Sequence, residues 1–283
     1  MLDHTFRLVP GIGGKIERRL WDAGIGTWDR LLAAADPPLA LATLALARDR
    51  LAEARARLAA GDAEWFARLL ATDEQWRLFY AFGDAVGYLD IETTGIGGGA
   101  DHITAIALYD GSQVRTFVHG INLHEFEQAV AGCKLIVTFN GKCFDVPIIE
   151  RELRIELPRA HIDLRYLLRS LGYQGGLKRI EKRFDIGRDE LDGVDGYFAV
   201  LLWWEYRNGG NPAALETLLA YNAADVIGLE TLLVHACNQK LKRTPFFAEL
   251  VQPLPRPPAN PHRADAGLIA ALRQRHFPVA GAG

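Results

Sequence analysis

The pattern of hydrophobic and polar positions divides the chain into two main parts. Residues 1–82 are typical of helices separated by turns, and the longest segment is rich in Ala, Leu and Arg, which have high helix propensity. We therefore predict a small all-helical domain here. Its helices are expected over Lys15–Ala23, Trp28–Ala35, Leu39–Ala60, Ala63–Ala71 and Glu74–Phe82.

From Val86 onward, short apolar segments bounded by turn residues predict β-strands. The strands are expected over Val86–Glu92, Ile103–Tyr109, Gln113–His119, Lys134–Phe139 and, as a short candidate, Ala160–Asp163. Helices are expected over Leu123–Ala131, Val146–Leu153, Leu164–Leu171, Leu177–Phe184, Tyr197–Asn208 and Ala213–Gln239. Strands in hairpin order followed by alternating helices and strands predict an α/β fold, in which helices cover the faces of a mixed sheet.

The C-terminal region has a different composition. Gln252–His262 contains five prolines, which exclude a helix or an inner strand and favour an extended linker. Residues 238–283 carry seven Lys and Arg against two Asp and Glu, so this end of the chain is basic. We therefore divide the chain into a helical region (1–82), an α/β domain (83–245) and a Pro-rich basic tail (246–283).

The overall composition is that of a globular protein, with 49% hydrophobic and 24% charged residues and a net charge of −3. It excludes a disordered chain, a coiled-coil rod and a uniformly basic nucleic-acid coat protein. Three scattered cysteines argue against a disulfide framework or a Cys-based zinc site. The longest apolar stretch, Leu39–Ala47, is too short for a membrane span, and the first residues lack the pattern of a signal peptide, so we expect a cytoplasmic protein.

Asp90 and Glu92 lie two residues apart in the first predicted strand, so strand periodicity points both side chains to one face. The neighbours Tyr88, Leu89 and Ile91 indicate that the strand is buried. Two buried carboxylates repel each other unless a cation neutralises them, which favours a metal site. The alternative is a solvated edge strand that carries acidic residues.

Two further acidic residues follow at a distance along the chain. Asp145 comes after the fourth predicted strand, at the entry to a helix, where it could equally act as an N-cap. The preceding Asn140-Gly141 supplies a tight turn, so the backbone there could approach a ligand closely. Tyr221 and Asp225 share one face of a long predicted helix. Leucines near that face direct Asp225 toward the interior, with a surface position as the alternative.

Together these segments resemble a known family. Asp-x-Glu on a first strand, Asn-x4-Asp after a later strand and Tyr-x3-Asp on a late helix resemble the three motifs of the DEDD superfamily of 3′–5′ exonucleases, in its tyrosine-bearing branch. His161–Leu164 and Gly175–Phe184 also look like the YprB-type ribonuclease H-like domain of bacterial proteins. The resemblance covers Gly87–Leu241 and implies a ribonuclease H-like fold.

By this resemblance, four carboxylates would be metal ligands, and Tyr221 would orient the attacking water. The four ligands would be Asp90, Glu92, Asp145 and Asp225. Such oxygen ligands suit Mg²⁺ or Mn²⁺, and two such ions could clamp the attacking and leaving oxygens of a displacement at phosphorus. Asp163 is a further acidic candidate, for which an ion pair with Arg165 or Arg169, or a cap at the strand end, is the alternative.

Basic residues indicate where nucleic acid could bind. Four of them lie close together on one predicted helix, where they could follow a phosphate backbone or simply form a solvated face. They are Lys178, Arg179, Lys182 and Arg183. Asn140 and Lys142 lie just before Asp145 and are closer candidates for a phosphate contact.

Leu8–Ile25 is similar to a helix-hairpin-helix motif, in which a Gly-hydrophobic-Gly turn precedes a helix. The turn would be Gly11-Ile12-Gly13, and its N–H groups, assisted by Lys15, could hold a phosphate without reading sequence. The first helix of a complete unit would have to come from Leu2–Leu8. The alternative is packing between short helices, because residues 1–80 carry no net charge.

These observations favour a metal-dependent 3′–5′ exonuclease, and the hairpin-like turn favours DNA over RNA as its partner. A structure-specific endonuclease and an exoribonuclease of the same fold are alternatives. A non-catalytic nucleic-acid-binding module is a third alternative, although it would leave clustered carboxylates unneutralised at a cost to stability.

Overall fold

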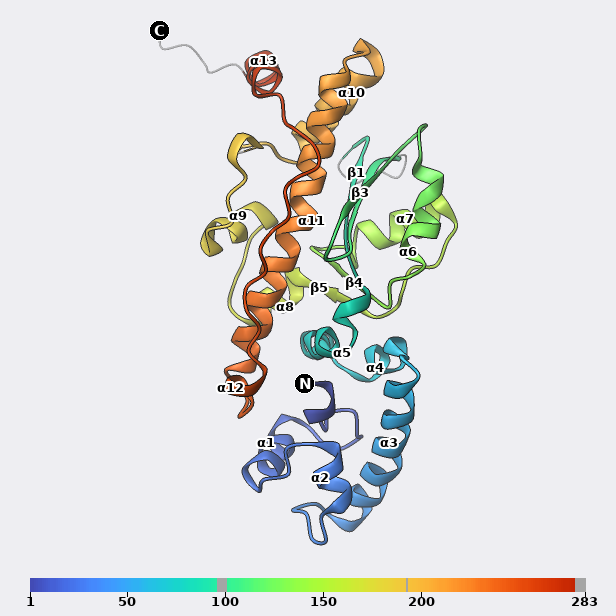
Figure 1. The fold of residues 1–283 in the computed structure, drawn as a ribbon, viewed down its shortest axis with the longest axis vertical. Coiled ribbons are helices and arrows are strands. Elements are labelled where there is room, and N and C mark those ends of the chain that lie inside the picture. The colour runs from blue at the N-terminus through green and yellow to red at the C-terminus, as the bar shows by residue number, and fades with distance from the viewer. Residues whose placement is uncertain (96–100, 192, 278–283) are drawn as a thin grey trace.

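The computed structural model describes residues 1–95, 101–191 and 193–277, and its centre is a five-stranded sheet of order β3-β2-β1-β4-β5 (Figure 1). The first three strands pair antiparallel, and β4 and β5 run parallel to β1. The strands are β1 (Val86–Thr93), β2 (Ile103–Tyr109), β3 (Val114–Val118), β4 (Leu135–Thr138) and β5 (His161–Asp163). The predicted α/β fold with a mixed sheet is confirmed.

Helices cover both faces of the sheet, and the alternation along β1 decides which side chain meets which helix. Leu89 and Ile91 pack on the face that also holds Phe126 and Ile149, from α6 (Phe126–Val130) and α7 (Asp145–Leu153). Tyr88 points to the other face, where α11 (Pro212–Leu241) lies across the sheet (Figure 1). Residues of β1 with even numbers therefore face α11.

The long helix α11 begins at a well-defined cap and is a core helix. The side chain of Asn211 accepts a hydrogen bond from the N–H of Ala213, and Pro212 occupies the first helical turn, where its missing N–H costs nothing. By length and composition α11 could span a membrane, but 78% of its most apolar window is buried inside the protein. Its apolar character is thus explained by contact with the sheet.

The other helices of this part are α8 (Leu164–Ser170), α9 (Leu177–Glu181) and α10 (Gly196–Gly209). The helix predicted over Leu177–Phe184 is interrupted, because α9 ends at Glu181 and a short 3₁₀ helix over Lys182–Phe184 follows it. Asp185 then adopts a left-handed backbone conformation with φ 55°, which ends the helix. The four basic residues of the predicted stripe therefore do not share one α-helix.

The regular secondary structure of residues 1–82 consists of helices joined by turns, as expected. The α-helices are α1 (Gly14–Asp22), α2 (Trp28–Ala33), α3 (Leu41–Ala59), α4 (Ala63–Leu69) and α5 (Phe79–Phe82). The last predicted helix begins instead as a 3₁₀ helix over Thr72–Leu78. Leu2–Leu8 forms only a three-residue 3₁₀ helix, so α1 and α2 follow the glycine turn without a full first helix before it.

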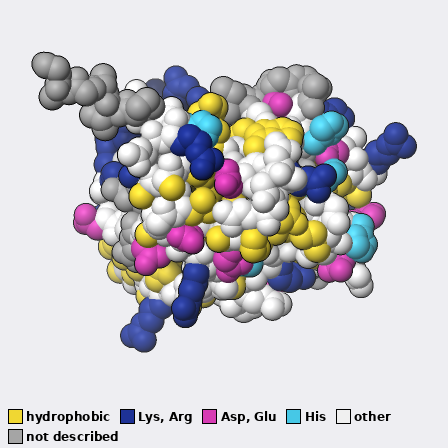
Figure 2. All heavy atoms as spheres, turned by 90° about the horizontal axis from the view of Figure 1, so that it is seen from above, with side chains coloured by type: hydrophobic (Ala, Val, Ile, Leu, Met, Phe, Trp, Pro, Cys, Tyr) yellow, Lys and Arg dark blue, Asp and Glu magenta, His cyan; other side chains and the backbone are white. Residues whose placement is uncertain are grey.

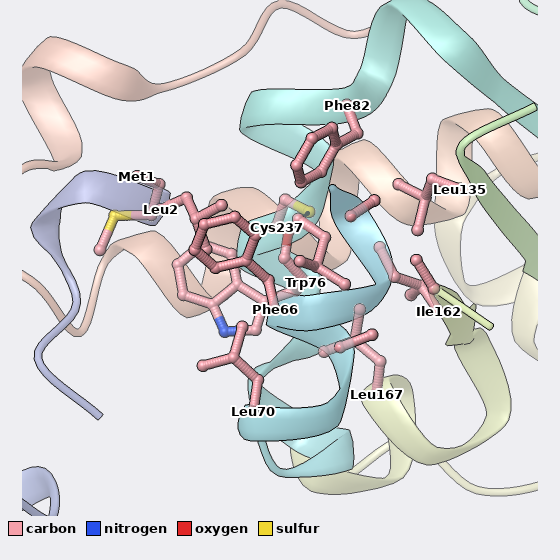
Figure 3. Close-up of a cluster of buried hydrophobic side chains, with 14 of the residues drawn as sticks. Met1, Leu2, Phe66, Leu70, Trp76, Phe82, Leu135, Ile162, Leu167 and Cys237 are labelled. Carbon is pink, nitrogen blue, oxygen red and sulfur yellow. Dashed lines mark hydrogen bonds between the residues drawn. The ribbon is translucent and has the colours of Figure 1, made fainter. Parts of the chain in front are cut away.

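The N-terminal helices and the sheet share one hydrophobic core. Phe66, Trp76 and Phe82 from the helical region lie in the same cluster as Leu135 of β4 and Ile162 of β5 (Figure 3). Trp76 is 2% exposed. Burial of one such large aromatic side chain is worth about 1.5–3 kcal/mol or more, so the helical region is docked firmly on the sheet.

A buried ion-pair network holds α1 to the 3₁₀ helix over Thr72–Leu78 within the helical region. Glu17 of α1, 2% exposed, accepts hydrogen bonds from the hydroxyl of Thr5 (2.6 Å) and the N–H of Phe6 (2.9 Å). Its other oxygen lies 3.3 Å from Nη2 of Arg77, which also pairs with Glu74. Buried charges persist only when they are paired, and Glu17 meets this condition through Arg77 and its two hydrogen bonds.

The C-terminal segment is extended between Val251 and Asp265 and lies along α11 (Figure 1). Asn238 and Gln252 exchange two hydrogen bonds, of 2.7 and 2.9 Å, and Asn260 donates to the carbonyl of Ala220 at 2.8 Å. Sequence analysis did not predict the short helix α12 (Phe247–Leu250) or α13 (Ala266–His276), which buries Ile269 and Leu272 beside α10. The last six residues of the tail, 278–283, lie outside the described part.

The edge strand β3 is partly covered by side chains. Asn122 accepts a hydrogen bond from the N–H of Val118 (2.7 Å) and donates one to the carbonyl of Thr116 (3.0 Å). His262 of the C-terminal segment lies 3.0 Å from the hydroxyl of Thr116 and 3.1 Å from Glu216. These contacts fix one end of the C-terminal segment to the edge of the sheet.

Seen from above, along the long axis of the molecule, one end of the protein displays charged side chains of both signs (Figure 2). Hydrophobic side chains show between them in the middle of this face. The described residues of this face form no patch of a single charge, in keeping with the net charge of −3. The described part of this face is therefore not the strongly basic kind of surface that binds a nucleic-acid backbone through its phosphates.

Loss of the Arg77 side chain should destabilise the protein strongly. Arg77→Ala leaves Glu17 buried without its cationic partner, and breaking a buried pair costs about 3–5 kcal/mol. Arg57→Ala is the matched control, because Arg57 is 45% exposed in its pairs with Glu53 and Asp62, and exposed pairs contribute about 0–1 kcal/mol. Urea unfolding of both variants tests this, and equal losses would contradict it.

Candidate metal centre

The first two predicted ligands are brought together by β1. Asp90 and Glu92 have even numbers and share the strand face that carries Tyr88, so both point toward α11. Asp90 pairs with Ala107 and Glu92 with Ala105 across β2, and the small alanines leave space beside the carboxylates. β1 is the middle strand of the sheet, so the solvated edge-strand alternative is wrong.

The third carboxylate comes from α11. Asp225 is 4% exposed, and one oxygen each from Asp90, Glu92 and Asp225 lie within 4.8 Å of one another. The surface alternative for Asp225 is therefore wrong. Asn222, one turn earlier and fully buried, donates a hydrogen bond of 2.7 Å from Nδ2 to Oδ2 of Asp90. Sequence analysis did not predict this contact, although Asn222 lies within the Tyr-x3-Asp motif.

The fourth predicted ligand, Asp145, lies next to β1 but outside this group of three. It is the first residue of α7 and is 3% exposed, and its Oδ1 accepts a hydrogen bond of 3.1 Å from the N–H of Ile91. Because Ile91 stands between Asp90 and Glu92, this bond fixes Asp145 beside them. Phe144 occupies the N-cap position of α7, so the N-cap interpretation of Asp145 is wrong.

Two cations reach the centre from the segment that follows α8. Lys178 of α9 and Arg188 both pair with Oδ1 of Asp225. Arg188 is held from its other side by Glu181, at 2.7 and 2.6 Å. Lys178 thus contacts a predicted metal ligand, whereas Arg179 and Lys182 are exposed. Sequence analysis missed Arg188, because its contact depends on how the loop after α9 folds back.

Tyr221 lies one helical turn before Asp225, in keeping with the predicted shared face. It is 3% exposed, and Nζ of Lys178 lies 4.1 Å from the centroid of its ring. Burial raises the pKa of Tyr221 far above its usual range, and the carboxylates of Asp225 and Glu92 raise it further. The phenol therefore stays protonated and can donate a hydrogen bond.

Crowding of buried acids shifts their protonation. Burial raises the pKa of Asp90 and Glu92 well above the usual range, and nearby Asp225 raises both further. Burial also raises the pKa of Asp145, and the hydrogen bond from Ile91 lowers it. The raising effect is the larger, and the pKa is about 7. Because Glu181 offsets the charge of Arg188, Lys178 is the one net cation that contacts these four carboxylates in the described chain. A hard divalent ion with oxygen ligands fits this donor set.

Asp163 has a different role from these acids. Its carboxylate accepts hydrogen bonds from the N–H groups of Asn140 (2.8 Å), Lys142 (3.1 Å) and Arg165 (3.0 Å). It therefore caps α8 and holds the loop after β4, in which Asn140 has a left-handed φ of 71°. The interpretation of Asp163 as a cap at the strand end describes this arrangement.

The other predicted nucleic-acid contacts lie in two places. Asn140 faces Arg165, and Nζ of Lys142 donates to Gln75 at 2.9 Å, both in the loop near the carboxylates. Gly11, with φ +87°, Gly13 and Lys15 are exposed at the start of α1, at the other end of the molecule (Figure 1). The two groups cannot therefore contact the same nucleotide.

A family model for the RNase H superfamily matches residues 87–237, which include β1, β4, β5 and most of α11. The chain belongs to the RNase H superfamily. Its fold is thus an RNase H-like fold, and members of this group generally use divalent metal ions. The acidic cluster lies in the part of the chain that the family model covers.

The chain is also similar to individual proteins. It is 27% identical over 178 residues to the uncharacterized protein YprB of Bacillus subtilis (strain 168), an alignment that covers 56% of this chain and 43% of YprB. The chain therefore matches less than half the length of that relative. The predicted similarity to YprB is confirmed. Among solved structures, the EXO domain of Nibbler from Aedes aegypti is 13% identical, with a TM-score of 0.41, over 60% of this chain and 86% of that domain.

Binding of Mn²⁺ should stabilise the protein, and more at pH 8 than at pH 5. The raised pKa values mean that protons occupy these carboxylates at low pH, and Mn²⁺ must displace them. Asp145 loses its proton as the pH rises through about 7, so metal affinity should rise over this range. At pH 8 and 100 times the Kd, we expect Tm to rise by about 5–10 °C.

Thermal unfolding with and without Mn²⁺ at the two pH values measures this difference. Asp225→Asn is the control and should show little response to Mn²⁺ at either pH. A rise in Tm at pH 5 that equals or exceeds the rise at pH 8 would contradict the expectation.

Proposed function

We propose that this protein is a metal-dependent 3′–5′ exonuclease that hydrolyses DNA and uses two Mg²⁺ or Mn²⁺ ions. The observation that supports this most directly is the group formed by Asp90, Glu92 and Asp225, with Asp145 hydrogen-bonded beside it. Four carboxylates, of which Glu92, Asp145 and Asp225 are buried and Asp90 is half-buried, are unfavourable beside one net cation, so the arrangement is best explained by a role in binding divalent cations. The order of the motifs further supports the tyrosine-bearing branch of the DEDD superfamily.

Each residue of the centre has a separate role in this proposal. Asp90, Glu92, Asp145 and Asp225 would hold the ions, which supply charge stabilisation at the attacking and leaving oxygens. The protonated phenol of Tyr221 would donate a hydrogen bond that orients the attacking water. Asn222 fixes the carboxylate of Asp90. The chain thereby provides a preorganised set of oxygens and one aligned donor.

A basic cavity beside the loop after β4 supports a nucleic-acid substrate. It has a volume of about 580 Å³, and its lining includes Phe139, Asn140, Arg165, Arg169 and Tyr173. Guanidinium groups bind phosphate oxygens, and aromatic rings can stack on bases. We therefore propose that the nucleic-acid strand approaches the carboxylates along this side. Lys142 lines a neighbouring pocket that also includes Arg169, and Lys178 contacts Asp225. Arg179 and Lys182 would contact phosphates further along the strand.

The preference for DNA in this proposal rests on the N-terminal turn. Gly11 and Gly13 are exposed, and Lys15 adds a positive charge there. Such a turn could hold a phosphate of a duplex without reading its sequence. Because it lies far from the carboxylates, it would bind a different part of the same DNA.

Asp225→Asn should reduce the rate of hydrolysis at least about 100-fold, because the loss of one electrostatic contact to the transition state typically costs about 10²–10³ in rate. Chelation by EDTA should have the same effect on the wild type. Asp84→Asn is the matched control, since Asp84 is exposed at the opposite end of β1 from Asp90. End-labelled single-stranded and duplex DNA and RNA, incubated with Mg²⁺ or Mn²⁺, provide the assay.

The same assay separates the alternatives. Release of single nucleotides from a free 3′ end, blocked by a 3′-phosphate, is the expected result. Cleavage of circular DNA would show an endonuclease, and faster degradation of RNA would show an exoribonuclease. Full activity of Asp225→Asn would remove this centre from consideration, and binding without hydrolysis of any substrate would favour the non-catalytic module.

A further inference from the structure

The Glu181 and Arg188 side chains form a rigid pair directly behind Asp225. The Glu181 side chain is 1% exposed and that of Arg188 is 8% exposed. Nε of Arg188 donates to one oxygen of Glu181 at 2.7 Å, and Nη2 donates to the other at 2.6 Å. Two parallel hydrogen bonds between a guanidinium and a carboxylate fix both planes, so neither side chain can rotate alone.

A glycine in α11 makes room for this pair. A Cβ atom at Gly228 would lie 2.6 Å from Oε1 of Glu181, which is too close for any side chain. Glycine is unfavourable inside a helix, and its φ here lies in the ordinary helical region, so backbone geometry does not require it. Gly228 lies three residues after Asp225, on the same side of the helix. Asp225 and the space at Gly228 that Glu181 occupies therefore lie about one turn apart on α11.

The Glu181–Arg188 pair also contacts Asp225, one of the proposed metal ligands. Nη2 of Arg188 also contacts Oδ1 of Asp225, which links Asp225, Arg188 and Glu181 into one chain of contacts. Because Glu181 balances the charge of Arg188, this contact orients Asp225 without adding a net positive charge that would repel a divalent ion. Lys178 differs in this respect, because it contacts the same oxygen but is 29% exposed, and its other contact is with the uncharged ring of Tyr221.

We propose that Glu181 and Arg188 are positioning residues for metal binding: they hold Oδ1 of Asp225 so that Oδ2 is directed at the ion. This inference rests on the proposed function, since it requires a divalent ion at this centre. Carboxylate ligands of metals are themselves commonly held by hydrogen bonds, and loss of such a support typically lowers metal affinity about 10–100-fold. Neither residue is expected to touch the substrate.

The test measures Mn²⁺ binding in the absence of nucleic acid. Binding is monitored as the decrease of the free-Mn²⁺ signal in electron paramagnetic resonance. Glu181→Gln and Arg188→Lys should each raise the Kd for Mn²⁺ about 10–100-fold. The two residues act as a unit, so the double variant should bind Mn²⁺ about as weakly as either single variant. Glu190→Gln in the same segment and Arg207→Lys in α10 change exposed residues and should leave the Kd within about twofold of wild type.

A second, independent change is Gly228→Ala, which should displace Glu181 and raise the Kd in the same way. Far-UV circular dichroism in EDTA checks that each variant is folded. If Glu181→Gln does not fold, the Kd of Arg188→Lys for Mn²⁺ tests the positioning role. In hydrolysis assays, higher Mn²⁺ should restore kcat, while KM for nucleic acid stays unchanged. A purely structural role would not produce this rescue.

The outcomes separate this inference from the proposed function. If the wild type binds Mn²⁺ but Glu181→Gln and Arg188→Lys bind it equally well, the positioning role is overturned and the metal centre stands. If the wild type binds Mn²⁺ and the variants bind it weakly, the role is supported even when no substrate is hydrolysed. If the wild type binds no Mn²⁺, the proposed metal centre is overturned and the positioning role with it.

Discussion

Repulsion between buried carboxylates is the constraint on which the rest of this structure depends. Asp90, Glu92 and Asp225 bring oxygens within 4.8 Å of one another, and Glu92 and Asp225 are buried while Asp90 is half-buried. In such surroundings charges interact strongly, so the backbone must hold these groups together against their own electrostatics. The central strand of the sheet and a 30-residue helix, both anchored in the core, supply the necessary rigidity.

Local periodicity accounts for what could be predicted from the sequence. The alternation in β1 places Asp90 and Glu92 on one face, and the four-residue spacing places Tyr221 beside Asp225. Every predicted strand exists, because each combines an apolar run with turn residues at its ends. Periodicity alone therefore predicts these two local pairs, whereas their meeting in one group is implied by the resemblance to the exonuclease motifs and depends on how α11 docks on β1.

Contacts between distant segments account for what could not be predicted. The bond between Asn222 and Asp90, and the approach of Arg188 to Asp225, depend on how separate elements dock. The end of α9 at Glu181 depends on a left-handed residue, Asp185, whose conformation no periodicity indicates. The sequence does hold one sign of these contacts, because a glycine inside a long apolar helix, here Gly228, indicates that another group lies close to the helix.

Capping of β3 has a consequence for how the protein behaves at high concentration. An uncovered outermost strand offers free N–H and C=O groups to the same strand of another molecule, which is a common route to fibrils. Here the amide of Asn122 occupies one N–H and one C=O of that row, and His262 adds a side chain from far along the chain. The segment rich in proline thereby contributes to colloidal behaviour as well as to the fold.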